Sequence, residues 1–363
     1  MLEKEVKGKK ERKYMATIAV LGAGSWGTAL SIVLADNGHN VRLWTHRKEQ
    51  AEEINNKHTN KRYLNVTIPS KITAYNDIKE ALDDVSVIVL VVPSKAIREV
   101  CQKLQPLLKQ DVTIVHATKG IEPKTLKRVS EMIAEEIPQY AYEDIVVLSG
   151  PSHAEEVAER HPTTVTVSAV NMQKAELAQD LFINEFFRVY TSTDIIGIEL
   201  GGSLKNIIAL GAGMSDGLGF GDNAKAALIT RGLAEIARLG TSLGANPLTF
   251  LGLPGVGDLI VTSTSTHSRN WRAGNLLGKG VPLETVLEQM GMVVEGVRTT
   301  QAAYELSRKN RVEMPITTAI YEILFAGKQP KDVVYQLMNR DKRVEMDNFA
   351  SLLKKSVIAE HVF

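Results

Sequence analysis

A lysine in an unusual setting is the first residue that could do chemistry. Lys205 lies in the stretch 195–213, where only Glu199 also carries a charge. Burial would lower the pKa of such a lysine, which would then suit proton transfer to or from an alcohol oxygen. Gly201 and Gly202 weaken a helix here, which makes sense if another segment must approach the backbone closely. The alternative is a snorkelling Lys205 with its head in water.

Two further candidates follow predicted strands. Lys119 comes just after the strand that ends near His116, at the strand end where ligands bind in open α/β sheets. A lysine on a surface loop is the alternative. Gly150 and Pro151 make a turn after another strand, and Ser152 could cap a helix that begins near His153. Capping alone would explain Ser152, so its role is open at this point.

A polar segment indicates an anion site. Seven of the nine residues from Thr262 to Asn270 carry hydroxyl or amide side chains. Arg269 offers a planar guanidinium that matches phosphate oxygens. Ser268 and Asn270 flank it just before a helical pattern, whose N-terminus would add backbone donors. A solvated polar loop is the alternative.

Three glycines have the spacing of a dinucleotide-binding turn. Gly22, Gly24 and Gly27 follow the apolar run 17–21 and precede a helical pattern over 28–37. The first would permit a tight turn, the second would let the backbone approach a pyrophosphate, and the third would let helix and strand pack closely. The phosphates would bind the free N–H groups of the helix N-terminus. A purely structural glycine turn is the alternative.

The end of the next predicted strand, 41–44, bears on which dinucleotide binds. A site for NAD usually places an acidic residue about 20 residues beyond the glycines, whereas an arginine there suits the 2′-phosphate of NADP. This chain has His46 and Arg47 at that point, and its first carboxylate there is Glu49. We therefore expect NADP(H) to be favoured, with NAD(H) also compatible.

An alternation of strand and helix patterns must position these residues. The predicted strands are 17–21, 41–44, 87–92, 112–116, 145–149, 163–168 and 187–191. The continuous apolar run 87–93 is typical of a strand buried on both faces. After residue 193 we expect helices alone, over 194–213, 223–243, 271–278, 283–290, 296–309, 315–326, 330–338 and 346–356.

These patterns predict an α/β Rossmann-type N-terminal domain, with a mostly parallel doubly wound sheet, followed by an all-α C-terminal domain. We expect a charged, flexible tail at 1–14, a dinucleotide-binding domain at 15–192 and a helical substrate-binding and catalytic domain at 193–363. The active site should lie where the domains meet, near the carboxyl ends of the strands.

Composition excludes several classes of protein. The net charge of +1 gives no broad basic surface for nucleic acid, and no apolar run is long enough to span a membrane. Residues 1–14 lack the apolar segment of a signal peptide. The single cysteine, Cys101, fits a reducing compartment, so we expect a cytoplasmic protein. Histidine and cysteine show no metal-ligand spacing, and we infer no catalytic metal.

Seven short motifs occur in a specific order: GAGSWG, KGIE, SGPSHAEE, ELGGSLKN, GVGDL, SRN and VVEG. Together they closely resemble the bacterial NAD(P)-dependent glycerol-3-phosphate dehydrogenase family, from Met15 to near the end of the chain. The resemblance implies a Rossmann domain with a helical C-terminal domain, and interconversion of dihydroxyacetone phosphate and sn-glycerol 3-phosphate. It also implies a homodimer that supplies the glycerol backbone of phospholipids.

The resemblance also implies roles for individual residues. Lys205 is the proton acceptor when the alcohol is oxidised, and Lys119 contacts both cofactor and substrate. The implied cofactor-binding residues are Gly22, Gly24, Ser25, Trp26, Gly27, His46, Arg47, Lys119, Ala154, Arg269, Val293 and Glu295. The implied substrate-binding residues are Lys119, Gly150, Ser152, Lys205, Asn206, Asp258, Ser268, Arg269 and Asn270. The chain departs from many relatives at Ser263, where they carry cysteine.

Two other functions would share parts of this pattern. A β-hydroxyacid dehydrogenase has the same plan and a helical lysine, but typically places its asparagine four residues further on, whereas Asn206 is adjacent to Lys205. A redox-sensing regulator would bind NAD(P)H without turnover. The presence of both Lys119 and Lys205 argues against it, because binding alone needs no desolvated lysine.

Overall fold

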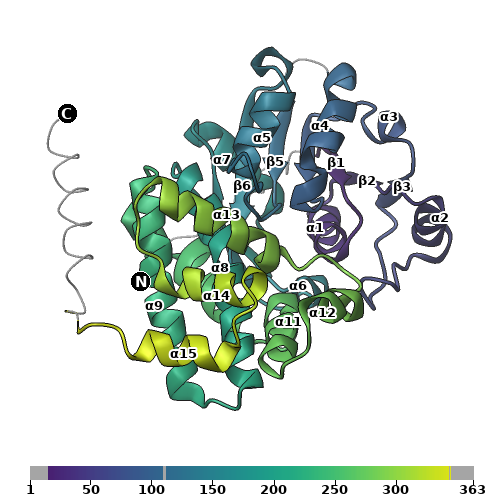
Figure 1. Cartoon of the computed structure of the whole chain (residues 1–363). Coiled ribbons are helices and arrows are strands. Elements are labelled where there is room, and N and C mark those ends of the chain that lie inside the picture. The colour runs from purple at the N-terminus through teal and green to yellow at the C-terminus, as the bar shows by residue number, and fades with distance from the viewer. Residues whose placement is uncertain (1–14, 109–111, 343, 345–363) are drawn as a thin grey trace, which may run out of the picture.

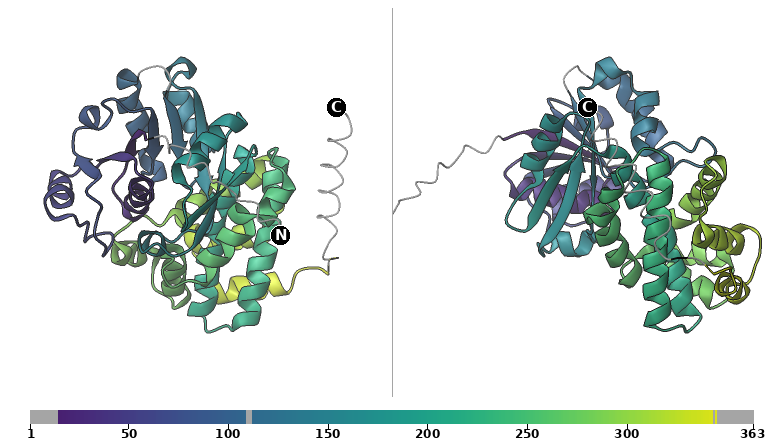
Figure 2. Two further views of the ribbon diagram at one scale, coloured as in Figure 1. Left: turned by 180° about the vertical axis from the view of Figure 1, so that it is seen from behind. Right: turned by 90° about the vertical axis from the view of Figure 1, so that its left-hand side faces the viewer.

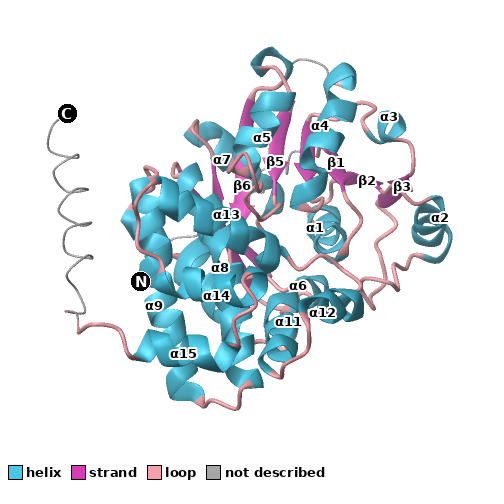
Figure 3. Ribbon diagram, viewed as in Figure 1, coloured by secondary structure: helices cyan, strands magenta, loops and turns pink. Residues whose placement is uncertain are grey.

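The computed structural model describes residues 15–108, 112–342 and 344. The tail 1–14 and the helical pattern predicted at 346–356 lie outside the described residues. Two parts are visible in Figure 1: a sheet with its helices, drawn from purple to teal, and a group of helices from green to yellow. Figure 3 shows that the strands are confined to the first part, as the sequence predicts.

The sheet has eight strands in the order β3-β2-β1-β4-β5-β6-β7-β8. Neighbouring strands are parallel except for the antiparallel pair β6–β7. This confirms the mostly parallel Rossmann-type sheet. The strands are β1 (Thr17–Leu21), β2 (Asn40–Trp44), β3 (Ile72–Tyr75), β4 (Val87–Leu90), β5 (Thr113–His116), β6 (Asp144–Ser149), β7 (Thr163–Ser168) and β8 (Phe187–Ser192). Sequence analysis missed β3, a four-residue edge strand too short to show a clear pattern.

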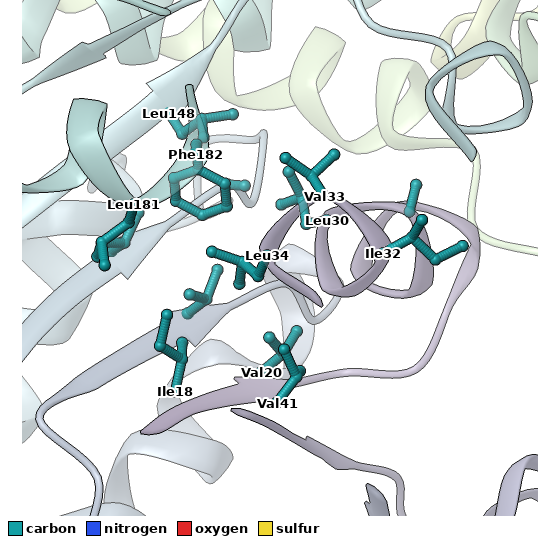
Figure 4. Close-up of a cluster of buried hydrophobic side chains, with 14 of the residues drawn as sticks. Ile18, Val20, Leu30, Ile32, Val33, Leu34, Val41, Leu148, Leu181 and Phe182 are labelled. Carbon is teal, nitrogen blue, oxygen red and sulfur yellow. The ribbon is translucent and has the colours of Figure 1, made fainter. Parts of the chain in front are cut away.

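Alternate residues of β1 face two separate hydrophobic clusters. Ile18 and Val20 pack with Leu30 and Leu34 of α1 (Ser25–Asp36), as Figure 4 shows, whereas Ala19 and Leu21 belong to the cluster on the opposite face. Helices therefore cover the sheet on both sides. The others are α2 (Lys48–Lys57), α3 (Ile78–Ala81), α4 (Ile97–Leu104), α5 (Val129–Glu136), α6 (Ala154–Ala158) and α7 (Met172–Phe182), with short 3₁₀ turns at Ser94–Ala96, Gln105–Leu107 and Gln139–Ala141.

The helical part surrounds one long helix, α8 (Ile195–Gly217), in which every residue from Gly197 to Ser215 is buried. It packs against α9, α10, α11 and α13, and also contacts β6 of the sheet. Figure 2 shows in its second view how the sheet lies beside the long helices. The remaining elements are α9 (Asp222–Ser242), η4 (Pro247–Leu251), η5 (Leu253–Gly257), α10 (Asp258–Thr264), α11 (Arg269–Gly278), α12 (Leu283–Met290), α13 (Glu295–Lys309), α14 (Pro315–Phe325) and α15 (Pro330–Met338).

Helix α8 is also the one described helix with the length and hydropathy to cross a membrane. Within its most apolar window, 89% of the residues are buried by the rest of the protein. An apolar helix enclosed by other helices needs no lipid to cover it, so α8 serves as the core of the helical part.

Three local predictions need correction. Helix α1 begins at Ser25 rather than at residue 28, because the glycine turn leads directly into the first helical turn. The segment after Gly252 forms the π-helical turn η5 and helix α10, and the hydroxyl-rich residues begin in the last turn of α10; neither element was predicted. Helix α11 begins at Arg269, before the predicted start at 271, because Ser268 caps it by accepting from the N–H of Trp271 at 3.2 Å.

Candidate active site

The glycine turn between β1 and α1 has the predicted close contacts. Gly22 has a φ of +119°, and a Cβ there would lie 2.6 Å from the carbonyl oxygen of Val91. Gly24 ends the turn as the N-cap of α1 and supplies no capping side chain. A Cβ on Gly24 would meet no atom within 4 Å. The turn therefore leaves open space beside the free N–H groups of the helix, as a pyrophosphate site requires.

A buried polar network that sequence analysis missed supports this turn. The amide of Gln50 donates to the carbonyl of Ala23 at 2.6 Å, and the amide of Asn60 donates to the same oxygen at 3.0 Å. Asn60 also donates to the Thr28 hydroxyl at 2.9 Å, and Thr45 donates to Gln50 at 2.7 Å. Three of these four contacts join residues 27 to 37 positions apart, so no local pattern could reveal the network.

Of the two basic residues after β2, Arg47 is linked to the glycine turn through Tyr63. Arg47 is half-buried at the N-cap of α2 and donates to the Tyr63 hydroxyl at 2.5 Å, whereas His46 is exposed. Ser25, at the start of α1, donates to the Tyr63 carbonyl at 3.2 Å. Tyr63 thus bridges the glycine turn and Arg47. Trp26, in the same helical turn, is partly buried against the sheet core.

Three residues far apart in sequence meet at a buried carboxylate. Nζ of Lys119 donates to Oδ2 of Asp258 at 2.6 Å, and Nζ of Lys205 donates to Oδ1 of the same carboxylate. Lys205 also donates to the Thr262 hydroxyl at 2.7 Å. Lys205 is 6% exposed and Asp258 1% exposed, whereas the Lys119 side chain is 21% exposed. Two ammonium groups on one carboxylate leave an excess of positive charge, which suits a substrate oxygen that gains negative charge.

Burial is the main influence on the acidity of Lys205. Burial lowers the pKa from 10.5 and the charge of Lys119 acts in the same direction, whereas Asp258 opposes them; together these effects place the pKa at about 7. An amine that titrates near neutral pH can both donate and accept a proton at the pH of a cell. This agrees with the expectation for a lysine in the apolar stretch 195–213.

Close packing of α8 against η5 explains how Asp258 reaches the lysines. A Cβ on Gly201 would lie 2.6 Å from the carbonyl oxygen of Pro254, so glycine is needed for η5 to approach the helix. Asp258 follows η5 directly and begins α10, with its side chain buried. The glycines of α8 therefore allow η5 to pack closely, and η5 leads directly to Asp258.

A chain of amide contacts runs from the lysine cluster to α13. Asn270 donates to Oδ1 of Asn206 at 2.9 Å and accepts from the N–H of Gly296 at 2.9 Å. The neighbouring Glu295 accepts from the N–H of Ser94 at 3.2 Å and from its hydroxyl at 2.8 Å. Val293 lies just before this helix start and is half-buried. Glu295 therefore links the helical part to the loop that follows the carboxyl end of β4.

The remaining candidates lie near the same lysines or at the start of α11. Ser152 does not cap α6; its hydroxyl donates to the carbonyl of Gly150 at 3.0 Å, and His153 is the N-cap. Lys119 also approaches that carbonyl, at 3.5 Å. Ala154 begins α6 and is buried. Arg269 is exposed, and its guanidinium has no hydrogen-bond partner among the described residues.

His153 is a further residue that sequence analysis did not single out. Its Nε2 lies 3.4 Å from the carbonyl oxygen of Val261, and its ring centre lies 6.0 Å from that of His267. Burial lowers the pKa of His153, and the charge of Lys205 lowers it further. Its position and these influences make His153 a neighbour of the lysine cluster. The described residues contain no group of three or more potential metal ligands.

The chain is similar to known proteins over both of its parts. Two family models match the chain: the N-terminus of NAD-dependent glycerol-3-phosphate dehydrogenase over residues 17–175, and its C-terminus over 194–335. The glycerol-3-phosphate dehydrogenase [NAD(P)+] of Oceanobacillus iheyensis is 71% identical over 341 residues, which cover 94% of this chain and 99% of the relative. The one from Geobacillus kaustophilus is 65% identical over 340 residues, covering 93% of this chain and 98% of the relative.

Solved structures are similar as well. A glycerol-3-phosphate dehydrogenase from Coxiella burnetii has 41% sequence identity and a TM-score of 0.86, and the match covers 90% of this chain and 99% of that one. The yeast enzyme has 28% identity and a TM-score of 0.77, covering 88% of this chain and 98% of that one.

Proposed function

This chain belongs to the NAD-dependent glycerol-3-phosphate dehydrogenase family, and we propose that Lys119, Lys205 and Asp258 form its catalytic centre. It is an oxidoreductase that uses NAD(P)H to reduce dihydroxyacetone phosphate reversibly to sn-glycerol 3-phosphate. The observation that carries the proposed centre is the convergence of the two lysines on one buried carboxylate.

Lys205 is the proposed proton donor and acceptor. In reduction, its ammonium group gives a proton to the C2 oxygen of dihydroxyacetone phosphate; in oxidation, the neutral amine takes the proton from the C2 hydroxyl. Asp258 and Thr262 fix the direction of Nζ through their hydrogen bonds. Lys119 adds a second positive charge, which stabilises the negative charge that develops on the C2 oxygen.

The residues that would hold the dinucleotide lie along the carboxyl ends of β1, β2 and β4. Bound NAD(P)H supplies the hydride that reaches C2. The N–H groups that follow Gly24 would bind its pyrophosphate, because no side chain caps that helix end. His46 and Arg47 would face the adenosine, and we propose a preference for NADP(H) because no carboxylate lies there to repel a 2′-phosphate. Glu295 and Val293 would approach from α13.

Arg269 is the proposed phosphate ligand of the substrate. Its guanidinium is exposed at the N-terminus of α11, which adds a favourable dipole for an anion. Ser268 and Asn270 lie on either side, and Asn270 also orients Asn206 beside Lys205. We propose that Asp258 acts mainly on the lysines, because a carboxylate would repel a phosphate group directly.

We also propose the domain boundaries, the oligomeric state and the cellular location of the enzyme. Residues 15–192 would form the cofactor domain and 193–363 the substrate domain; the end of β8 at Ser192 and the start of α8 at Ile195 support this boundary. Exposed Phe186 and Tyr190, at the edge strand β8, support a homodimer, which light scattering would test.

The single buried thiol of Cys101 supports a cytoplasmic location, where the product would supply phospholipid synthesis.

The direct test of the function is NADPH oxidation followed by absorbance with alternative substrates. We expect rapid oxidation with dihydroxyacetone phosphate and none with a β-keto acid such as acetoacetate. Oxidation with the β-keto acid alone would indicate a β-hydroxyacid dehydrogenase instead. NADPH binding without turnover on either substrate would indicate a regulator.

A further inference from the structure

Glu199 is a buried carboxylate on α8 that takes no part in the mechanism above. It is 6% exposed and lies six residues before Lys205. Its Oε1 accepts from the N–H of Ser130 at 2.7 Å, and its Oε2 accepts from the Ser130 hydroxyl at 2.6 Å and from Arg128 at 2.5 Å. Nε2 of the buried His116 lies 3.3 Å from Oε1. Both carboxylate oxygens are therefore occupied.

The partners of Glu199 all come from the sheet part of the molecule. His116 is the last residue of β5, and Arg128 and Ser130 lie at the start of α5. The segment 116–130 between them carries Lys119. Glu199 thus holds both ends of the segment that delivers the second lysine.

Ser203, which lies between Glu199 and Lys205 on α8, makes a second contact with the Lys119 segment. The hydroxyl of Ser203 accepts from the N–H of Gly120 at 2.8 Å, directly beside Lys119. Gly120 has a φ of +147° and packs against Ser94, so the backbone at this point has one close-fitting position. The long side chain of Lys119 has one short hydrogen bond within the described part of the chain, to Asp258. The placement of its backbone therefore depends on α8.

We call the contacts of Glu199 with His116, Arg128 and Ser130 the Glu199 clamp. The negative charge of Glu199 stabilises this clamp. Burial alone would raise the pKa of Glu199, but the nearby His116, Arg128 and Ser130 outweigh it and lower the pKa to about 2. The Glu199 carboxylate is therefore ionised at neutral pH. Replacement by an amide would keep the shape but remove the charge that Arg128 and His116 face.

We propose that Glu199 is a positioning residue, which fixes the Lys119 segment against α8 so that Lys119 and Lys205 reach opposite oxygens of Asp258. The inference rests on the proposed roles of these lysines. Glu199 does not touch the reacting atoms; it acts through Lys119. Loss of the clamp should therefore reduce turnover more than binding of the cofactor.

The first variant is Glu199→Gln. We expect kcat for dihydroxyacetone phosphate reduction to fall about tenfold or more, while the Kd of NADPH changes less than about threefold. Glu235→Gln is the matched control, because Glu235 is an equally buried carboxylate that binds the start of α14, away from both lysines. An equal loss of kcat in this control would show that buried carboxylates act through general stability, and would overturn the proposal.

A double-mutant cycle with Lys119→Met decides whether Glu199 acts through Lys119. In that background, Glu199→Gln should cost less than about twofold in kcat. The same factor of loss in both backgrounds, or wild-type kcat in Glu199→Gln, would contradict the proposal. If Glu199→Gln does not fold, Ser203→Ala replaces it in the cycle, with an expected loss of about threefold that again disappears without Lys119. The wild-type rate with dihydroxyacetone phosphate, measured first, tests the proposed function separately.

Discussion

Asp258 is the residue on which the proposed site depends, because its carboxylate binds the ammonium groups of both lysines. It is 1% exposed and accepts from both ammonium groups. A buried pair loses stability when one partner is removed, because the remaining charge has no compensation. The motif around Asp258 led to its choice as a site residue, but its contacts could not be predicted, since residues 119, 205 and 258 meet only in the folded chain.

The acidity of Lys205 predicts the pH dependence of the reaction. Its pKa is lowered to about 7, and only its protonated form can give a proton to the C2 oxygen. The kcat of reduction should therefore be constant below pH 7 and fall about tenfold per pH unit above it. The kcat of oxidation should rise over the same range. Steady-state rates at saturating substrates check this, and a reduction rate that stays constant to about pH 9 would contradict it.

Arg47 should set the choice of cofactor. In Arg47→Asp a carboxylate would repel a 2′-phosphate and accept from a ribose hydroxyl, so preference should shift from NADPH towards NADH. The ratio of kcat/KM for the two cofactors measures the shift. Lys57→Asp makes the same charge change at the far end of α2 and should leave the ratio unchanged. An unaltered ratio in Arg47→Asp would place Arg47 outside the adenosine site.

Arg269 should hold the substrate phosphate. A charged hydrogen bond of this kind contributes about 1.5–3 kcal/mol, so Arg269→Leu should raise the KM for dihydroxyacetone phosphate about tenfold or more. Arg272→Leu removes another exposed arginine of α11 and serves as the control. NADPH affinity must be measured as well. If NADPH binding collapses while KM stays constant, Arg269 belongs to the cofactor site.

Secondary-structure elements explain why the sequence revealed some of this arrangement and not the rest. The glycine turn and α8 have strong patterns, because a buried strand and an apolar helix are continuous in sequence. Helix α10 and η5 were missed because hydroxyl residues and Gly252–Gly257 resemble a loop. They fold as helical turns because η5 packs into the notch at Gly201 of α8, which is a tertiary effect.

Glu235 links two elements and predicts how stability varies with pH. This carboxylate of α9 accepts from the N–H groups of Ile316 (2.6 Å) and Thr317 (3.1 Å) at the start of α14. Burial raises its pKa from 4.5 to about 7, despite those hydrogen bonds. A raised pKa in the folded state gives stability that is present below pH 4.5 and is lost as pH rises through 7, by about 3 kcal/mol.

Urea unfolding at about pH 5 and about pH 8 measures this contribution. The free energy of unfolding should fall between the two pH values by more in the wild type than in Glu235→Gln, which cannot ionise. Glu284→Gln, an exposed change at the start of α12, should behave like the wild type. Equal falls in wild type and Glu235→Gln would show that Glu235 is already ionised at pH 5.

The proposed reaction depends on contacts between the sheet part and the helical part of the chain. The proposed dinucleotide-binding turn lies in the sheet part, whereas Lys205, Asp258 and Arg269 all come from the helical part. Two residues of the sheet part contact the helical part: Lys119 donates to Asp258, and Ser94 donates to Glu295. The order of strands and helices could be predicted from sequence, but not these contacts, because they join residues more than 130 positions apart.

Lys205→Met tests the central claim that cofactor binding and proton transfer reside in different parts of the molecule. Methionine keeps most of the side-chain volume but cannot carry a proton. We expect dihydroxyacetone phosphate reduction to fall by about 10²–10⁴-fold, with the Kd of NADPH, followed by its fluorescence, unchanged within about threefold. Lys331→Met, an exposed change on α15, should retain full activity. Near wild-type turnover in Lys205→Met would remove Lys205 from the mechanism and contradict this account.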